Sequence, residues 1–208
     1  MNEYDQPTRL TFDLKQSAAE LLGRAFLDDP MMQFIEPDDA RRARFVTWLM
    51  GTVVTYCLLY GEVYATPGFE GVACWLPPGQ THFTPWRVIR AGIPAVRLKL
   101  TTAALIRFRH NELYLDRIQK RLMPGRHWYL FAVGVEPGCQ GQGIGSRLLQ
   151  PVLERANAAG MPCYLETHNP ENLPFYEKHG FATVSAGEVP HHSLRVWAMV
   201  KRADRIDQ

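Results

Sequence analysis

Three closely spaced glycines after a hydrophobic run are the residues whose chemistry is easiest to interpret. The segment His127–Ser146 reads HWYLFAVGVEPGCQGQGIGS and contains Gly141, Gly143 and Gly145. Glycine-rich backbone lets N–H groups converge on an anion, and the helix that follows adds the positive end of its dipole. Apolar residues recur at helical spacing from Ile144 onward. The segment therefore predicts a strand, a phosphate-binding loop and a helix.

Two common nucleotide-binding loops fit this segment poorly. A Walker loop requires Gly-Lys-Ser/Thr, and the segment has no lysine. A dinucleotide fingerprint requires G-x-G-x-x-G, but counting from Gly141 places Ser146 last, and counting from Gly143 places Leu148 last. Glu166 does follow at roughly the 20-residue distance of a ribose-binding acid. A dinucleotide-binding protein therefore stays as an outside alternative.

Two motifs together resemble the GNAT superfamily of acyl-CoA-dependent N-acetyltransferases. The pattern Gln140-x-x-Gly143-x-Gly145, directly after a Val-x-Val-x-Pro strand end, is similar to the first family motif. The segment Leu165–Phe181, LETHNPENLPFYEKHGF, is similar to the second. Within the superfamily, residues 127–208 most resemble puromycin N-acetyltransferase and its relatives. The resemblance implies an α/β fold in which a mixed central β-sheet, splayed at the cofactor site, has flanking helices.

The same resemblance implies acetyl-CoA as cosubstrate and assigns residues to it. The loop amides would hold the pyrophosphate, and the preceding strand would offer backbone groups to the pantetheine arm and the acetyl carbonyl. The implied contacts are Val133, Gly134, Val135, Gln140, Gly141, Gln142, Gly143, Ile144, Gly145, Ser146, Asn169 and Asn172. Gly134 would permit close approach of a ligand, although glycine in a core strand can equally serve packing. Asn169 could instead cap a helix, and Asn172 would then contact the cofactor.

Acetyl transfer requires a neutral attacking amine and a proton for the leaving thiolate. By resemblance, Tyr176 is the general acid, whereas its sequence neighbourhood alone would place it in the core beside Phe175. Glu166 is the candidate general base because it lies in a short strand next to the expected splay, although a surface or hydrogen-bonding role is equally consistent. Glu136 and His168 are further candidates. Cys139 has no activating His or Asp pattern and is interpreted as incidental.

The acceptor is expected to be a primary amine of a small molecule. The resemblance implies that the N-terminal helices and the loop between the last strands frame its site. Phe26, Asp29, Trp75, Trp128 and Tyr129 could line it, since aromatic walls with one carboxylate suit a small amine. The alternatives are a protein lysine or N-terminal acetyltransferase, and a non-catalytic acyl-CoA-binding regulatory module.

Local patterns place these residues on elements. Before the glycine-rich segment we expect a first strand within Pro7–Leu14. A helix with the capping-box pair Ser17 and Glu20 should follow and end at Asp28-Asp29-Pro30, and a second helix should run from Pro37 to Gly61. Two strands, Glu62–Thr66 and Gly71–Leu76, should come next. After it we expect the strand Trp128–Val135, a helix bent by Pro151 and ending at Gly160, the strand Cys163–Thr167, a helix starting near Asn169 or Asn172, and strands Phe181–Ser185 and Leu194–Lys201.

A helical insert of about residues 84–123 precedes the central strand. One helix starts at Thr84 and is kinked or broken by Pro94, and a second runs from about Thr102 to Leu122. The insert carries nine lysines and arginines against two acidic residues. The pattern indicates a solvated helix face or, less commonly, an anion-attracting wall near a cofactor phosphate or an acidic acceptor.

Composition narrows the class of protein. The 208 residues suit one large domain or two small ones, and the resemblance implies a single domain, residues 1–208. With 46% hydrophobic and 21% charged residues and a net charge of +2, the composition is typical of a globular protein without general affinity for nucleic acid or membrane. The polar N-terminus is unlike a signal peptide, and the apolar run Phe45–Tyr60 predicts a core helix rather than a membrane span. Four scattered cysteines predict no metal site and no disulfide framework. We expect a cytoplasmic monomer or homodimer, with His191 and His192 solvated.

Overall fold

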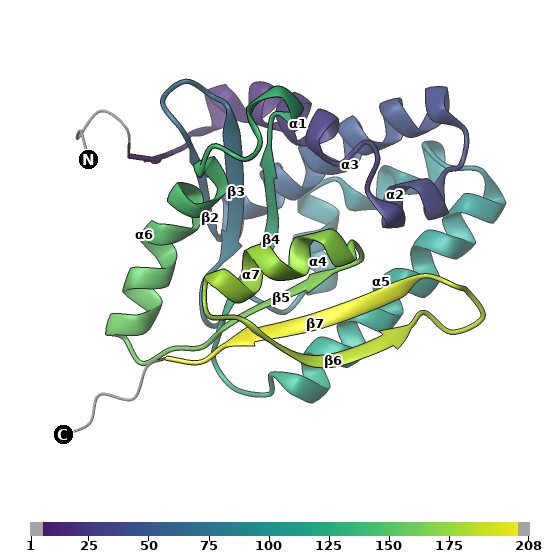
Figure 1. The fold of residues 1–208 in the computed structure, drawn as a ribbon. Coiled ribbons are helices and arrows are strands. Elements are labelled where there is room, and N and C mark those ends of the chain that lie inside the picture. Colours follow the sequence, from purple (N-terminus) through teal and green to yellow (C-terminus); the bar gives the residue numbers. More distant parts are fainter. Residues whose placement is uncertain (1–5, 204–208) are drawn as a thin grey trace.

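A single mixed β-sheet forms the centre of the computed structural model, which describes residues 6–203. Within that part of the chain the strand order is β1-β2-β3-β4-β5-β7-β6. All neighbours are antiparallel except β4 and β5, which are parallel (Figure 1). The strands are β1 (Thr8–Arg9), β2 (Glu62–Ala65), β3 (Gly71–Leu76), β4 (Trp128–Val135), β5 (Cys163–Thr167), β6 (Ala182–Glu188) and β7 (Arg195–Lys201). The sheet confirms the predicted fold class.

The parallel pair β4 and β5 stays together for only two residue pairs. Trp128 is opposite Cys163 and Tyr129 is opposite Tyr164, and beyond these the strands run apart (Figure 1). On its other edge β4 contains a bulge, because Cys74 and Trp75 of β3 pair with Ala132 and Leu130 and leave residue 131 unmatched. A bulge bends its strand and increases the local twist. The splay expected of the sheet is therefore present at its middle.

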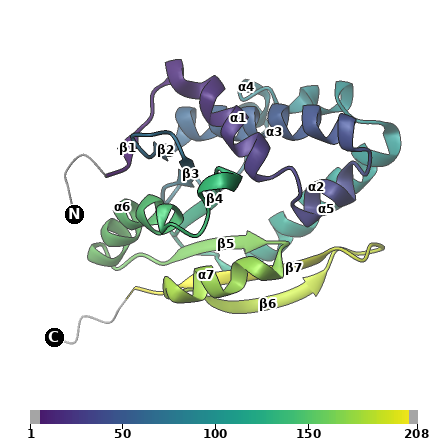
Figure 2. The ribbon, with the colours of Figure 1, turned by 45° about the horizontal axis from the view of Figure 1, so that its top comes forward.

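Helices cover both faces of the sheet. They are α1 (Lys15–Ala25), α2 (Pro30–Ile35), α3 (Asp39–Tyr60), α4 (Pro85–Arg90), α5 (Thr102–Leu122), α6 (Ile144–Ala158) and α7 (Leu173–Lys178). Alternate residues of β3 divide the core, since Val72 and Cys74 pack in the cluster that contains α1 and α3, whereas Ala73 and Trp75 pack with α6. Figure 2 shows α1 and α3 above the sheet and α6 and α7 on its other side.

Helix α3 is the core helix predicted from the apolar run. Asp38 caps it by accepting from the Arg41 backbone N–H at 2.8 Å, and Gly61 follows its last residue. With 22 residues it is longer than that run, and it is the one helix within residues 6–203 whose length and composition would suit a membrane span. Half of its most apolar window is buried against the rest of the fold. A packed core helix passes the same test.

The N-terminal helices begin and end differently from the prediction. Helix α1 starts at Lys15 without a side-chain cap, so the capping box of Ser17 and Glu20 is wrong. Asp29-Pro30 does not simply end a helix. Asp29 caps the new helix α2 by accepting from the Met31 backbone N–H at 2.9 Å, and Pro30 occupies the first turn, where no N–H is needed.

The insert folds as α4, a 3-10 helix over Ile93–Leu98, and α5. The break comes at Gly92, whose φ of +83° is left-handed, two residues before the predicted kink at Pro94. Thr101 caps α5 by accepting from the Ala104 backbone N–H at 3.3 Å, so the start and end of this helix match the prediction. Several α5 side chains join the core cluster that contains α3. The insert is therefore packed onto the α3 side of the sheet.

Candidate active site

The backbone N–H and C=O groups of two residues at the end of β4 point into the gap between β4 and β5. Just past β4, the Glu136 N–H donates to the Glu70 carbonyl oxygen on the β3 side at 2.7 Å. Because hydrogen-bonding groups alternate along an antiparallel strand, Val135 and Val133 direct theirs away from β3. Among residues 6–203 no strand pairs with them there, since β5 has already diverged. The Gln140 side chain contacts this edge, because its Nε2 donates to the Val135 carbonyl oxygen at 3.4 Å.

The glycine-rich loop joins β4 to α6 as predicted. A short 3-10 turn over Pro137–Cys139 leads into two left-handed glycines, Gly141 with a φ of +77° and Gly143 with a φ of +76°. Gly143 precedes the first residue of α6, and no side chain caps this helix. The first N–H groups of a helix lack intrahelical partners. The loop therefore leaves donors available for an anion, which fits the pyrophosphate of coenzyme A.

The structure gives Gly134 a packing role. A Cβ atom at this position would lie 2.8 Å from the Cβ of Ala25 and 2.8 Å from the Cδ2 of Leu22, both on α1. The hydrogen-bonding groups of Gly134 lie on the β3 side, opposite Val72, by the same alternation. Glycine is therefore required here by the close approach of α1, and a contact between Gly134 and the cofactor stays a prediction.

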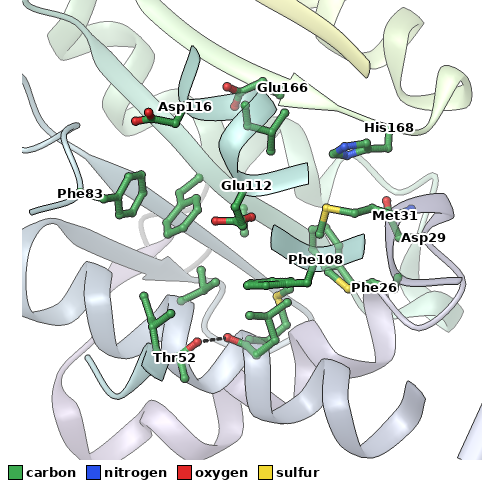
Figure 3. Close-up of a pocket in the computed structure, with 18 of the residues that line it drawn as sticks. Phe26, Asp29, Met31, Thr52, Phe83, Phe108, Glu112, Asp116, Glu166 and His168 are labelled. Carbon is green, nitrogen blue, oxygen red and sulfur yellow. Dashed lines mark hydrogen bonds between the residues drawn. The ribbon is translucent and has the colours of Figure 1, made fainter. Parts of the chain in front are cut away.

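A cavity of about 780 Å³ opens beside the splay (Figure 3). Of the predicted catalytic and cofactor-binding residues, Val133, Glu166, Asn172 and Tyr176 line it, as does the further candidate base His168. The glycine-rich loop, Gly134, Val135 and Asn169 are not part of its wall. The structure therefore brings both proposed catalytic residues to one cavity, while most of the predicted cofactor contacts lie along the β4 end and the loop.

Tyr176 lies on α7 and is buried, with 8% of its surface exposed. It packs edge-on to Phe175 and Phe181, so both the core interpretation and the cavity interpretation of this residue apply. Burial, and secondarily the negative charge of Asp29, raises the pKa of Tyr176. The phenol therefore keeps its proton at neutral pH and can act as a donor.

Glu166 lies on β5 and faces the cavity. Burial raises the pKa of this carboxyl to about 7. The hydroxyls of Tyr164 and Tyr129 oppose that rise and the charge of Glu112 adds to it. A carboxylate with a pKa near neutrality is well matched to accept a proton at physiological pH.

The two asparagines divide the roles left open by the sequence. Asn169 caps a 3-10 turn, because its side-chain oxygen accepts from the Glu171 backbone N–H at 3.0 Å. Asn172 lines the cavity, and its Nδ2 donates to Thr167 Oγ1 at 3.5 Å. Asn172 is therefore the better placed of the two for a ligand, although contacts with the cofactor stay predictions for both.

Glu136 is unsuited to the role of base. It forms a bidentate ion pair with Arg24, with the Nε of Arg24 2.8 Å from Oε1 and the Nη2 of Arg24 2.9 Å from Oε2. Hydrogen bonding to Arg24 lowers the pKa of Glu136, and the residue is not part of the cavity wall. The ion pair instead joins α1 to the turn after β4.

The acceptor wall was predicted only in part. Phe26, Asp29 and Tyr129 line the cavity, but Trp75 and Trp128 do not. The two indoles pack edge-to-face in the core beneath α6, with ring centroids 6.5 Å apart. They face away because side chains alternate along β3 and β4, which places them on the opposite side of the sheet.

The insert supplies much of the wall, and sequence reasoning missed its contribution. Phe83 precedes α4, and Phe108, Glu112, Asp116 and Gln119 project from α5 (Figure 3). A signal was present in α5, because Glu112 interrupts a stripe of apolar residues at helical spacing. A carboxylate in such a stripe is expected only where the stripe faces something polar.

The basic residues of the insert serve several purposes. Arg107 donates to the Ile35 carbonyl oxygen from Nη2 at 2.7 Å, which joins α5 to α2. Arg97, Arg109 and Lys120 are exposed side chains that line the cavity. The insert is therefore neither simply a solvated face nor simply an anion-binding wall.

The connection between β6 and β7 also packs against the insert. The Nε2 of His192 is 2.9 Å from the Nδ1 of His110 on α5, and the His192 ring contacts Phe34 edge-on with centroids 4.9 Å apart. The expectation that both histidines are solvated is wrong for His192, while His191 is exposed. Within residues 6–203 no group of three or more His, Cys, Asp or Glu side chains could hold a metal ion.

Comparisons with known proteins agree on the family. A model of the GNAT acetyltransferase family matches residues 23–181. An uncharacterised N-acetyltransferase of Schizosaccharomyces pombe is 28% identical over 177 residues, which cover 81% of this chain and 70% of the relative.

Solved structures share the fold. A protein from Corynebacterium glutamicum, described as histone acetyltransferase HPA2 and related acetyltransferase, has a TM-score of 0.64 at 22% identity and covers 98% of this chain and 99% of its own. The polyamine N-acetyltransferase of Drosophila melanogaster, which forms N-acetylagmatine, has a TM-score of 0.60 at 12% identity and covers 94% and 98%. With the family match over most of its length and a sheet splayed between β4 and β5, the chain belongs to the GNAT acetyltransferase family.

Proposed function

We propose that the chain transfers the acetyl group of acetyl-CoA directly to a primary amine of a small molecule. The family uses acetyl-CoA as cosubstrate. The observation that carries the proposal is the convergence of three features on one splay: unpaired backbone groups of β4, a glycine-rich helix start, and a cavity with Tyr176 and Glu166 in its wall. Together they supply a place for the cofactor, a place for the acceptor and two groups that can move protons.

The cofactor would lie along β4 with its pyrophosphate at the start of α6. There the loop N–H groups and the helix dipole stabilise negative charge. The polar groups of Val133 and Val135 would hold the pantetheine arm, and a backbone N–H in this stretch would stabilise the oxyanion of the tetrahedral intermediate. Gln140, Gly141, Gln142, Ser146 and Asn172 remain proposed contacts.

The proposed chemistry balances with two proton-transfer groups. Glu166 takes the proton from the acceptor ammonium, and the neutral nitrogen attacks the thioester carbonyl. The new N–C bond forms, the C–S bond breaks, and the electron pair leaves on sulfur. Tyr176 donates to that sulfur, and its raised pKa keeps the donor proton in place until then. As the intermediate collapses, its nitrogen loses a second proton through water to the Tyr176 phenolate, and Glu166 releases the first proton to solvent, so the products are the amide, the thiol and one proton.

A small acceptor is favoured by the shape and lining of the cavity. It is about 780 Å³ in volume, within the range of small-molecule sites. The Drosophila neighbour acts on a small amine, and the resemblance to puromycin N-acetyltransferase points the same way. A protein acetyltransferase would need an open groove for a peptide beside the thioester. A non-catalytic binding module would have no need for a proton donor and a carboxylate together in the cavity.

One experiment separates these candidates. Isothermal titration should show acetyl-CoA binding to the purified chain, and release of free thiol should then be followed across panels of small amines and of peptides. Thiol release with small amines alone supports the proposal. Release with peptides alone would favour a protein acetyltransferase, and binding without any release would favour the regulatory module. Tighter binding of NAD than of acetyl-CoA would contradict all three.

We also expect the chain to act as one domain in the cytoplasm, as a monomer or homodimer. No affinity for nucleic acid or membrane is expected, given the net charge of +2.

A further inference from the structure

Helix α5 presents a carboxylate to the cavity from the middle of an apolar stripe. Leu105, Phe108, Glu112, Leu115 and Gln119 follow one another at spacings of three and four residues, and all line the cavity. Figure 3 shows Glu112 projecting into the cavity above Phe108. The side chain is exposed, so a ligand that enters the cavity can reach its carboxylate.

Glu112 shares the cavity with Glu166, which comes from β5. Both side chains line the cavity, from α5 and from β5, and Figure 3 draws both among the residues of its wall. Desolvation within the cavity and the charge of Asp116 raise the pKa of Glu112 to about 7, although part of the side chain is exposed. The charge of Glu112 in turn raises the pKa of Glu166. The two carboxyls therefore hinder each other's ionisation, and a bound cation would relieve both.

The charged residues of the cavity wall favour a cationic ligand. Asp29 on α2 adds a third carboxyl to the wall, and burial raises its pKa to about 6. The cations of the wall, Arg97, Arg109 and Lys120, are exposed, and Lys120 Nζ is 2.8 Å from the Asp116 carboxylate. His168 adds no positive charge, because burial lowers its pKa to about 4. Besides these exposed cations, the wall therefore carries three carboxyls with a raised pKa, Asp29, Glu112 and Glu166.

The apolar residues of the cavity wall favour a ligand whose uncharged part is apolar. Phe83, Phe108, Phe131 and Tyr129 contribute aromatic rings to the cavity wall, and the rings of Phe83 and Phe131 are 5.2 Å apart at their centroids. Faces of aromatic rings also attract cations. An ammonium ion on a flat or branched apolar body satisfies both parts of the wall at once, whereas a polar or anionic ligand satisfies neither.

We propose that Glu112 and Glu166 jointly bind the ammonium group of an acceptor amine with an aromatic body, and that Glu112 is the specificity-determining residue contributed by the insert. This inference rests on the proposed acetyl transfer to a small amine. Glu112 holds the ammonium in place by charge and hydrogen bonding, and Glu166 receives its proton. Glu112 itself takes no part in breaking or forming bonds.

Binding tests the site without requiring turnover. Isothermal titration at pH 7 compares 2-phenylethylamine with the neutral 2-phenylethanol and the anionic 3-phenylpropanoate, on the wild-type chain saturated with coenzyme A. The amine should bind at least about tenfold more tightly than the other two, with release of protons to the buffer. Glu112→Gln should remove most of that preference. Glu177→Gln, which removes an exposed carboxylate from α7, should preserve it. Equal affinity for the three probes would overturn the inference.

Steady-state kinetics shows whether an unexpected result contradicts the role of Glu112 or the proposed acetyl transfer. With acetyl-CoA and 2-phenylethylamine, Glu112→Gln should raise KM about tenfold or more and leave kcat within about threefold. The acid limb of its pH profile should move to lower pH, because the charge that raises the pKa of Glu166 is gone. Acetylation with an unchanged KM and pH profile would contradict the role of Glu112 alone. Binding that depends on Glu112 without acetylation would contradict the proposed function alone.

Discussion

The Nε2 atom of His168 lies 2.9 Å from the Oδ1 atom of Asn111, where the end of β5 meets the insert. A carbonyl oxygen only accepts, so the neutral imidazole carries its proton on Nε2. The Nδ2 of Asn111 in turn donates to the Sδ of Met31 at 3.1 Å. Because burial lowers the pKa of His168 to about 4, the ring is neutral and a weak base at physiological pH. Glu166 is the stronger candidate for the base.

Asn111→Leu should destabilise the protein by about 1–3 kcal/mol, because it leaves the buried His168 N–H without an acceptor. Urea unfolding followed by tryptophan fluorescence measures the loss. The double variant Asn111→Leu, His168→Leu is the control, since it removes donor and acceptor together. It should cost less than the sum of the two single changes, and strict additivity would show that the hydrogen bond contributes nothing.

Gly143→Ala should weaken binding of acetyl-CoA at least about tenfold, because the residue must adopt a left-handed conformation at the start of α6. Gly160 provides a matched control. It is also left-handed, with a φ of +63°, but it follows the other end of α6. Alanine at either position should cost about 1 kcal/mol of stability. Calorimetry should show a loss of acetyl-CoA affinity for Gly143→Ala and none for Gly160→Ala. Equal losses of affinity in the two variants would argue against the loop as the phosphate site.

Gly134→Ala should cost about 1–3 kcal/mol through overpacking, since the new Cβ would lie 2.8 Å from side chains of α1. Ala25→Gly on the same background removes one of the two contacts and should restore part of the stability. Thermal and urea unfolding measure both effects. If Gly134→Ala folds with full stability and only its acetyl-CoA affinity falls, the ligand-contact interpretation of this glycine is correct and the packing interpretation is not.

Tyr176→Phe should lower the single-turnover rate of acetyl transfer about 10²–10⁴-fold while leaving acetyl-CoA affinity nearly unchanged, because it removes only the proton donor. Single-turnover conditions are needed so that product release does not mask chemistry. Tyr114→Phe is the control on α5, outside the cavity wall, and should retain the wild-type rate. An intact rate in the Tyr176 variant would exclude the phenol as the acid.

The wild-type kcat/KM should rise with pH through about 7, where Glu166 becomes a carboxylate able to accept a proton. Glu166→Gln should lower the rate and abolish this limb of the profile. The initial rate of thiol release between pH 5.5 and 9 measures both. A limb that persists in the variant with the same midpoint would assign the base to another group.

Glu166→Gln should also change stability in a pH-dependent way. Burial raises the pKa of the carboxyl from 4.5 to about 7, so the folded chain binds its proton more tightly than the unfolded chain does. The wild type therefore loses stability as pH rises from 4.5 to about 7 and stays at the lower level above. The variant should be more stable than the wild type by about 1–3 kcal/mol at pH 8 and gain little at pH 4.5. A gain that does not vary with pH would contradict burial as the cause.

The central elements could be predicted because their signals are local. The strands Trp128–Val135 and Cys163–Thr167 have the predicted bounds, since each is an apolar run ended by turn residues. Thr101 and Leu122 likewise bound α5 through a cap and a change of pattern. The predicted helix bounds were wrong where one sequence pattern is compatible with two structures. Asp29-Pro30 lies between the end of one helix and the start of the next, and proline is compatible both with the residues after a helix and with its first turn.

The acceptor side of the cavity could not be predicted because its residues meet only in three dimensions. Trp75 and Trp128 looked suitable by residue type, but strand alternation places them beneath α6. Glu112 looked like one acidic residue on a basic helix. Its position depends on how the insert packs across the sheet, and no motif records that packing. The proposed catalytic residues lie within motifs, whereas the acceptor wall is assembled from segments far apart in the sequence.

The insert between β3 and β4 has a consequence for how such a protein can diversify. The proposed thioester site is built from β4, the glycine-rich loop and α7, while one continuous stretch, residues 84–122, supplies Glu112 and much of the remaining wall. A gene that exchanges or lengthens this stretch would alter the proposed acceptor wall and leave the proposed thioester site unchanged. Designers could exploit the same division by grafting alternative inserts onto one unchanged catalytic frame.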